Sequence, residues 1–172
     1  MRFTLPELRY EEKMSTVHSS ADAVTDAVLT ASRLLVAVSA RSIAAVDESI
    51  TLPQFRLLVV LSTQGAVKLM QVADQLGVAP STATRMIDRL LNAGLVDREI
   101  NPQSRREIVV SLSQAGQAVV RQVTQRRRRD IARIIARMPE QHRQGLVEVL
   151  EAFSEAGGEP PANLAESGTD WI

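Results

Sequence analysis

The chain has 172 residues, of which 45% are hydrophobic and 23% are charged, and its formal net charge at pH 7 is zero. This length suits one compact domain better than two. The sequence contains no cysteine, which excludes structural disulfides, thiol catalysis and thiol-based peroxide sensing.

The net charge of zero hides an uneven distribution along the chain. Residues 81–143 contain thirteen arginines and six acidic residues, whereas residues 144–172 contain six acidic residues and no lysine or arginine. A basic centre followed by an acidic end is compatible with binding to a nucleic acid.

Targeting and membrane signals are not expected in this sequence. No apolar run is expected to approach the ~18 residues needed to cross a bilayer, and the charged N-terminus lacks the apolar core of a signal peptide. The sequence therefore predicts a cytoplasmic protein with no membrane partner. Residues 1–19 are expected to form a flexible arm, and residues 157–172 a flexible acidic tail.

The two flanks of the chain are predicted to form amphipathic helices. Residues 20–48 place apolar side chains at helical spacing, and residues 113–156 are expected to form a helix from Ser113 to about Met138, followed by one that Pro139 opens. The positions predicted to pack against a second copy of the chain are Val24, Val28, Leu35, Leu146, Val149, Leu150 and Phe153. A homodimer is the expected solution, because these helices exceed what one small core needs, and a bundle within one chain is the alternative.

Residues 69–92 have the pattern of two short helices joined by a tight turn. Gly77 ends the first helix in the left-handed conformation, and Pro80 suits the first turn of the second helix. Gly94 is expected to end the second helix. The apolar positions of both helices fall on one face each: Leu69, Val72, Ala73 and Leu76, then Ala83, Met86, Ile87, Leu90 and Leu91.

The opposite face of the second helix is polar and basic, with Ser81, Thr82, Thr84, Arg85 and Arg89. Hydroxyl and guanidinium groups pair with base edges and phosphates. This helix is therefore predicted to enter the major groove of double-stranded DNA. A dimer would place two such helices one DNA turn apart, ~34 to 36 Å, on a two-fold operator.

Residues 95–100 and 108–112 are predicted to form a β-hairpin around residues 101–104. Arg105 and Arg106 stand where the second strand leaves the loop, a position suited to a narrow groove or a row of phosphates. The predicted fold is mainly α with a small β-hairpin wing: a winged helix-turn-helix domain over about residues 51–112, flanked by dimerisation helices, within a domain of residues 20–156.

Five short motifs occur in this order: Thr51-Leu52-Pro53-Gln54-Phe55, Ser81-Thr82 with Thr84-Arg85, Gly94-Leu95-Val96, Asn101-Pro102 with Arg105-Arg106, and Leu112-Ser113-Gln114-Ala115-Gly116. Together they resemble the multiple-antibiotic-resistance regulator (MarR) family over roughly residues 20–155. The resemblance implies a homodimeric transcription factor, usually a repressor, that binds a pseudo-palindromic operator. It also implies release by a small aromatic anion, in a pocket for which Arg41, Phe55 and Leu58 are candidates.

The sequence departs from the family pattern at two positions. Ser104 stands where relatives usually carry an aspartate that braces a wing arginine, so the wing is either looser or relies on Glu107. Ala79 stands where relatives tend to carry a capping aspartate, and alanine is a poor N-cap. Ser81 or a DNA phosphate is expected to accept hydrogen bonds from that helix end instead.

No constellation of catalytic residues is present, so an enzyme is not predicted, and neither a cofactor nor a metal site is expected. The alternative to a DNA-binding regulator is a winged-helix module that binds other proteins. Such a module would carry an apolar or acidic outer helix face, whereas Ser81, Thr82, Arg85 and Arg89 are polar or basic.

Overall fold

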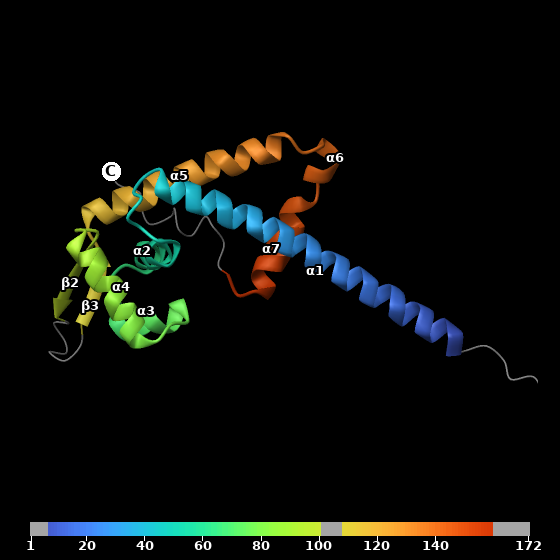
Figure 1. Ribbon diagram of the computed structural model, residues 1–172, viewed down its shortest axis with the longest axis horizontal. Helices are drawn as coiled ribbons and strands as arrows, with labels where there is room; N and C mark the ends of the chain where they lie inside the picture. The colour runs from blue at the N-terminus through green and yellow to red at the C-terminus, as the bar shows by residue number, and fades with distance from the viewer. Residues whose placement is uncertain (1–6, 101–107, 160–172) are drawn as a thin grey trace, which may run out of the picture. The chain divides into compact units, whose positions relative to one another are not determined.

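The computed structural model of the protein describes the backbone of residues 7–100 and 108–159 and the side chains of residues 21–99 and 108–159. The chain divides into two compact units, residues 1–39 and residues 40–172. The described elements, shown in Figure 1, are α1 (Glu7–Ala44), α2 (Leu52–Gln64), β1 (Val67–Lys68), α3 (Leu69–Leu76), α4 (Pro80–Asn92), β2 (Val96–Ile100), β3 (Ile108–Leu112), α5 (Gln114–Ala136), α6 (Glu140–Arg143) and α7 (Leu146–Ala156).

The first helix starts earlier than the sequence predicted. Residues 7–19, expected to be a flexible arm, belong to α1. The reason is local, because the stretch from Glu7 to Ala44 contains no proline or glycine and its first turns are rich in Glu, Lys, Leu and Met, which favour a helix. The helix ends before the predicted boundary at residue 48, where Asp47 Oδ1 accepts hydrogen bonds from the Ser49 N–H at 2.8 Å and its hydroxyl at 2.6 Å.

The apolar character of α1 is also greater than expected. The stretch Ala21–Ala44 is long and apolar enough to cross a membrane by length and composition alone, with a mean hydropathy of 1.5. The sequence prediction that no apolar run approaches this length is therefore wrong. Arg33 and Arg41 are the only charged residues in residues 27–44, and two isolated charges do not remove the apolar character of the stretch. Within this stretch, only 11% of its 18-residue apolar segment is buried.

The helix-turn-helix follows the sequence prediction closely. α3 ends at Gly77, whose φ of 64° and ψ of 36° lie in the left-handed region. Pro80 is the first residue of α4, and Gly94 beyond its end has a φ of 70°. The predicted inward faces are confirmed by the burial of Val72 and Ala73 on α3 and of Ala83, Ile87 and Leu90 on α4.

The sheet has three antiparallel strands in the order β1-β3-β2. In the predicted hairpin, Val96 pairs with Leu112 and Ile100 pairs with Ile108. The third strand, β1, was not predicted, because two residues are too few to show a strand periodicity. Its Val67 pairs with Val110 in the centre of β3.

One hydrophobic core joins the winged-helix elements, and each fully buried Leu or Ile contributes about 1.5–3 kcal/mol to it. Its largest members with almost no exposed surface are Leu57, Leu58, Leu61, Ile87 and Leu90. The core fixes the inward face of α4 and therefore leaves its opposite face to the solvent.

The start of α5 is joined to the winged-helix elements by Ser113. Its hydroxyl accepts a hydrogen bond from the Gly116 N–H at 3.0 Å and donates one to the Gly94 carbonyl at 2.7 Å. The predicted long helix from Ser113 to about Met138 is α5, which ends at Ala136, and Pro139 directly precedes α6 as expected.

Candidate nucleic-acid interface

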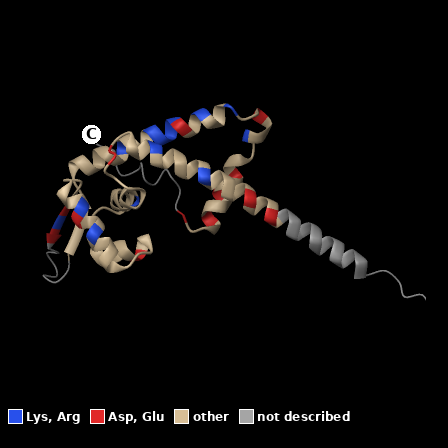
Figure 2. Cartoon of the chain, in the orientation of Figure 1, with Lys and Arg blue, Asp and Glu red and all other residues tan. Residues whose placement is uncertain are grey.

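The exposed face of α4, called the recognition helix from here on, carries the side chains that the sequence predicted to contact DNA. Ser81, Arg85 and Arg89 are exposed, and Thr82 and Thr84 are half-buried. Figure 2 shows basic residues along this helix. The core therefore holds a helix whose outward donors are hydroxyl and guanidinium groups.

Two of these side chains are already engaged with neighbours on the helix. Arg85 Nη2 lies 3.5 Å from Thr82 Oγ1, to which it donates a long hydrogen bond. Thr84 Oγ1 donates to the Pro80 carbonyl at 2.9 Å, so its hydroxyl is directed to its own helix. Arg85 is thus held by one long hydrogen bond, and its other N–H groups remain available to a ligand. The hydroxyl hydrogen of Thr84 is already donated.

An ion pair links the recognition helix to the wing. Arg98 Nη1, on β2, lies 3.5 Å from Asp88 Oδ1. Neither residue is among the predicted site residues, and the only sequence signal for Arg98 is an arginine on a strand next to the wing loop. The pair brings a further guanidinium to the surface that carries Arg85 and Arg89.

The first turn of the recognition helix lacks a capping side chain. Its N-cap residue is Ala79, whose carbonyl accepts the N–H groups of Thr82 at 2.8 Å and Ala83 at 3.1 Å. Among the described residues, the Ser81 hydroxyl makes no hydrogen bond to this helix end, so of the two expected acceptors, Ser81 and a DNA phosphate, only the phosphate remains a prediction. An unfilled helix N-terminus is a favourable place for a phosphate.

The tip of the wing lies outside the described residues, and with it Arg105 and Arg106, as well as Ser104 and Glu107. The strands that carry this tip are described, and Val110 at the centre of β3 is fully buried. The two arginines therefore remain predicted contacts, attached to strands that the core holds in place.

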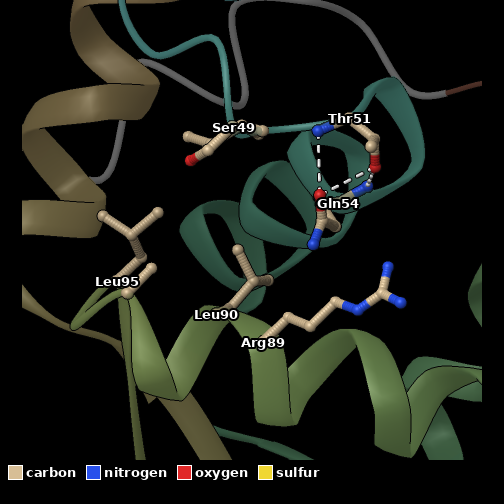
Figure 3. Close-up of a pocket in the computed structure, with 8 residues that line it drawn as sticks. Ser49, Thr51, Gln54, Arg89, Leu90 and Leu95 are labelled. Carbon is tan, nitrogen blue, oxygen red and sulfur yellow. Dashed lines mark hydrogen bonds between the residues drawn. The ribbon is translucent and has the colours of Figure 1, made fainter.

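A cavity of about 250 Å³ lies between the start of α2 and the second half of the recognition helix (Figure 3). None of the three predicted ligand residues lines it. Phe55 and Leu58 are buried in the core, because α2 turns them inward, and Arg41 is exposed. The cavity instead contains Arg89, together with Gln54, which was not among the predicted site residues. The only sequence signal for Gln54 is its position three residues after Thr51, the spacing of a capping box.

The predicted dimer positions are largely uncovered within their own units. In α1, Val24 is 61% exposed and Leu35 is 42% exposed, and Val28 is half-buried. The predicted dimer positions of α7 are also largely uncovered. Leu146 is half-buried, and the exposed residues are Val149, Leu150 and Phe153.

Comparison with known proteins gives a consistent result. The profile of the MarR family matches residues 50–108. The "Multiple antibiotic resistance protein MarR" of Salmonella typhimurium is 34% identical over 82 residues, which are 48% of this chain and 57% of that protein. The "HTH-type transcriptional repressor MdtR" of Bacillus subtilis is 28% identical over 109 residues, 63% of this chain and 70% of that protein. The chain thus spans less than two thirds of the length of the Salmonella protein.

Solved structures extend the similarity beyond the winged helix. RV1404 from Mycobacterium tuberculosis is 58% identical, with a TM-score of 0.78 over 83% of this chain and 97% of that one. A MarR variant from E. coli, solved in complex with operator DNA, shares the fold with a TM-score of 0.60 and 22% identity, over 76% of this chain and 93% of that one. The helix-turn-helix, the wing and these similarities lead to one conclusion: the chain belongs to the MarR family of winged helix-turn-helix transcriptional regulators.

Proposed function

We propose that the protein is a repressor that binds a pseudo-palindromic operator in double-stranded DNA as a homodimer and is released by a small-molecule anion. The observation that carries this proposal is the recognition helix, whose inward face is locked in the core while Ser81, Arg85 and Arg89 are exposed. A helix fixed in this way presents its donors to a groove with little loss of conformational freedom.

Arg85 is the residue proposed to read a base. A guanidinium that pairs bidentately with a guanine contributes about 1–3 kcal/mol of discrimination against other bases. Its long contact with Thr82 at 3.5 Å is easily exchanged for a base edge. Ser81 and the uncapped N-terminus of the helix are proposed to meet phosphates, which fix the register of the helix in the groove.

The homodimer is proposed from the uncovered apolar side chains of the flanking helices. In α7, Val149 is 64% exposed and Phe153 is 58% exposed. Large neighbouring apolar side chains on one surface indicate an interaction site rather than a solvated face. The same explanation applies to the apolar stretch of α1, which a second copy would cover without a membrane, and it agrees with the proposed cytoplasmic location.

Repression is proposed from the relatives, whereas release by a small anion is proposed from the family resemblance of the sequence alone. MdtR of Bacillus subtilis is named a repressor, and operator DNA is bound by the E. coli MarR variant. A ligand can release DNA only to the extent that it binds the DNA-free form more tightly, and a coupling of about 1–3 kcal/mol is typical.

Selection of bound fragments from a random DNA pool tests the proposal directly. We expect one enriched motif with two-fold symmetry, and its occurrence upstream of a promoter would allow repression to be measured with a reporter. In a gel shift, Arg85→Ala should weaken binding to the selected site more than to scrambled DNA, whereas Arg121→Ala, which removes an exposed arginine of α5, should change neither. Recovery of no motif, with equal weak retention of all fragments, would contradict the proposal.

A further inference from the structure

The second half of α5, together with the residue that follows it, carries exposed arginines along one side. They occur at steps of three and four residues, which is the spacing of one helical face. These residues form the arginine row: Arg126, Arg129, Arg133 and Arg137. Asp130, the single acidic residue of α5, pairs with Arg133, and among the described residues the other three form no ion pair. Like charges at this spacing destabilise a helix, so negative charges that cover the row would stabilise it.

A second row, of opposite charge, lies on α7. Its members are all exposed and form the glutamate row: Glu148, Glu151 and Glu155. None of them pairs with a basic side chain in the part of the chain that the structure describes. The row extends over seven residues, a rise of about 10.5 Å, and Arg126 and Arg133 are separated by the same rise on α5. The two rows, visible in Figure 2 as basic residues on α5 and acidic residues on α7, therefore match in spacing as well as in charge.

The glutamate row and the apolar stripe of α7 are on opposite sides of the helix. Residues two apart on a helix point about 200° apart, and Glu151 is two residues from both Val149 and Phe153. A second copy that covers the apolar stripe, as proposed above for the homodimer, therefore leaves the glutamate row exposed. The contact that forms the dimer does not use these carboxylates, and they remain available to a further partner.

We propose that the arginine row of one homodimer binds the glutamate row of a second homodimer, so that another copy of the chain covers this side of α5. The inference rests on the proposed function in one respect, because it takes the apolar stripe of α7 to be covered within the dimer. Guanidinium groups suit such a contact, since each can donate two parallel N–H groups to one carboxylate. The contact joins two different surfaces, so each pairing leaves further rows open and association can continue from dimer to dimer.

This contact is weak in dilute solution and effective at close range. Exposed ion pairs contribute little individually and are screened by salt. Two dimers on neighbouring operators, however, are held at an effective concentration on the order of millimolar. Under that condition the rows favour the occupation of one operator when the next is occupied. They thus supply a cooperativity that the recognition helices alone do not provide.

Charge reversal in each row, followed by mixing, tests the contact in the full chain. Arg126→Glu/Arg129→Glu reverses two members of the arginine row, and Glu151→Arg/Glu155→Arg reverses two members of the glutamate row. Sedimentation velocity over a series of protein concentrations measures association at about 0.01 M and about 1 M salt, where the screening length is about 30 Å and about 3 Å. Circular dichroism measures the folding of each variant.

The matched control is Arg121→Glu/Arg128→Glu, which changes the charge by the same amount at exposed positions on another side of α5. We expect the wild type and this control to associate beyond the dimer in low salt and to return to the dimer in high salt. Each row variant alone should associate at least about tenfold more weakly in low salt. An equal mixture of the two row variants should regain association, because the reversed rows complement each other, and this regain excludes misfolding as the cause of the loss.

DNA with two adjacent operators tests the consequence for regulation. The wild type should occupy the two sites cooperatively, whereas Glu151→Arg/Glu155→Arg should bind a single operator at least as tightly and lose the cooperativity. Cooperativity retained by both row variants would overturn the inference.

The oligomeric state separates a failure of this inference from a failure of the proposed function. A wild type that stays dimeric at both salt concentrations would overturn the inference and leave the homodimer in place. A monomer in high salt would contradict the homodimer and the inference with it. Association that is unchanged in both row variants, or that mixing does not restore, would also overturn the inference. If the wild type stays dimeric and Arg126→Glu/Arg129→Glu loses affinity for scrambled DNA, the arginine row binds nucleic acid instead.

Discussion

Asp88 on the recognition helix and Arg98 on β2 form an ion pair in which Oδ1 and Nη1 are 3.5 Å apart. Both side chains are partly exposed, at 51% and 37% of their surface, so the pair contributes at most about 1 kcal/mol to stability. Its larger effect is geometric, because it orients Arg98 and the wing strand relative to the helix that is proposed to enter the groove.

Asp88→Asn is expected to weaken operator binding although it removes a negative charge from the proposed DNA surface. The reason is that Arg98 loses the partner that orients it. Asp97→Asn is the matched control, since it removes the same charge from an exposed neighbour on β2, and it should leave affinity equal or slightly higher. Fluorescence anisotropy with labelled operator measures both. Tighter binding by both variants would show that Asp88 acts only through its charge.

The wing arginines are expected to contact the DNA backbone or the minor groove. Replacing both in Arg105→Ala/Arg106→Ala should weaken binding to every sequence and lower the slope of log affinity against log salt by about 1 for each phosphate that is no longer neutralised. Arg126→Ala/Arg127→Ala removes the same charge from exposed positions of α5 and should have a smaller effect. An unchanged slope in the wing variant would contradict the assignment.

Leu150→Glu is expected to break the dimer without unfolding the chain. Leu150 is 51% exposed in the single chain, so a carboxylate there costs little in a monomer, whereas in a closed interface an unpaired charge costs several kcal/mol. Multi-angle light scattering should find a folded monomer. Ala152→Glu adds the same charge away from the Leu150 stripe and should remain dimeric. Two dimeric variants would place the interface elsewhere.

Gly116→Ala is expected to destabilise the fold by about 1–3 kcal/mol. A Cβ at this position would overlap the carbonyl oxygen of Leu95, which is backbone and cannot rotate away. Gly157→Ala is the control, because its Cβ would meet its nearest atom at an ordinary 3.5 Å, and it should change the free energy of unfolding by less than about 0.5 kcal/mol. Denaturant unfolding compares the two, and equal stability would show that α5 can shift to make room.

The parts of the fold that sequence predicted well depend on local chemistry. Gly77 and Pro80 each determine one helix end by their own backbone preferences, and the apolar spacing determines which face of each helix is buried. The parts that were missed depend on contacts between distant residues. The Asp88–Arg98 pair needs β2 to lie beside the recognition helix, and Phe55 and Leu58 enter the core only because of how α2 rotates against it. The cavity beside Gln54 exists only when the α1–α2 turn packs over the end of the recognition helix.

The hydrogen bonds of Ser113 restrain the connection between the end of the recognition helix and the start of α5. Gly94, which follows the recognition helix, and Gly116, in the first turn of α5, are both bonded to one hydroxyl. α5 has 23 residues and is therefore a rigid lever of about 35 Å. A tilt of about 5° displaces one end by roughly 3 Å relative to the other, which is close to the ~3.4 Å rise between bases along one DNA strand. A tilt of α5 by a few degrees, applied at its C-terminal end, is thus sufficient to shift the recognition helix by one base pair along the DNA. Such a tilt is too small to disturb the packing of the core.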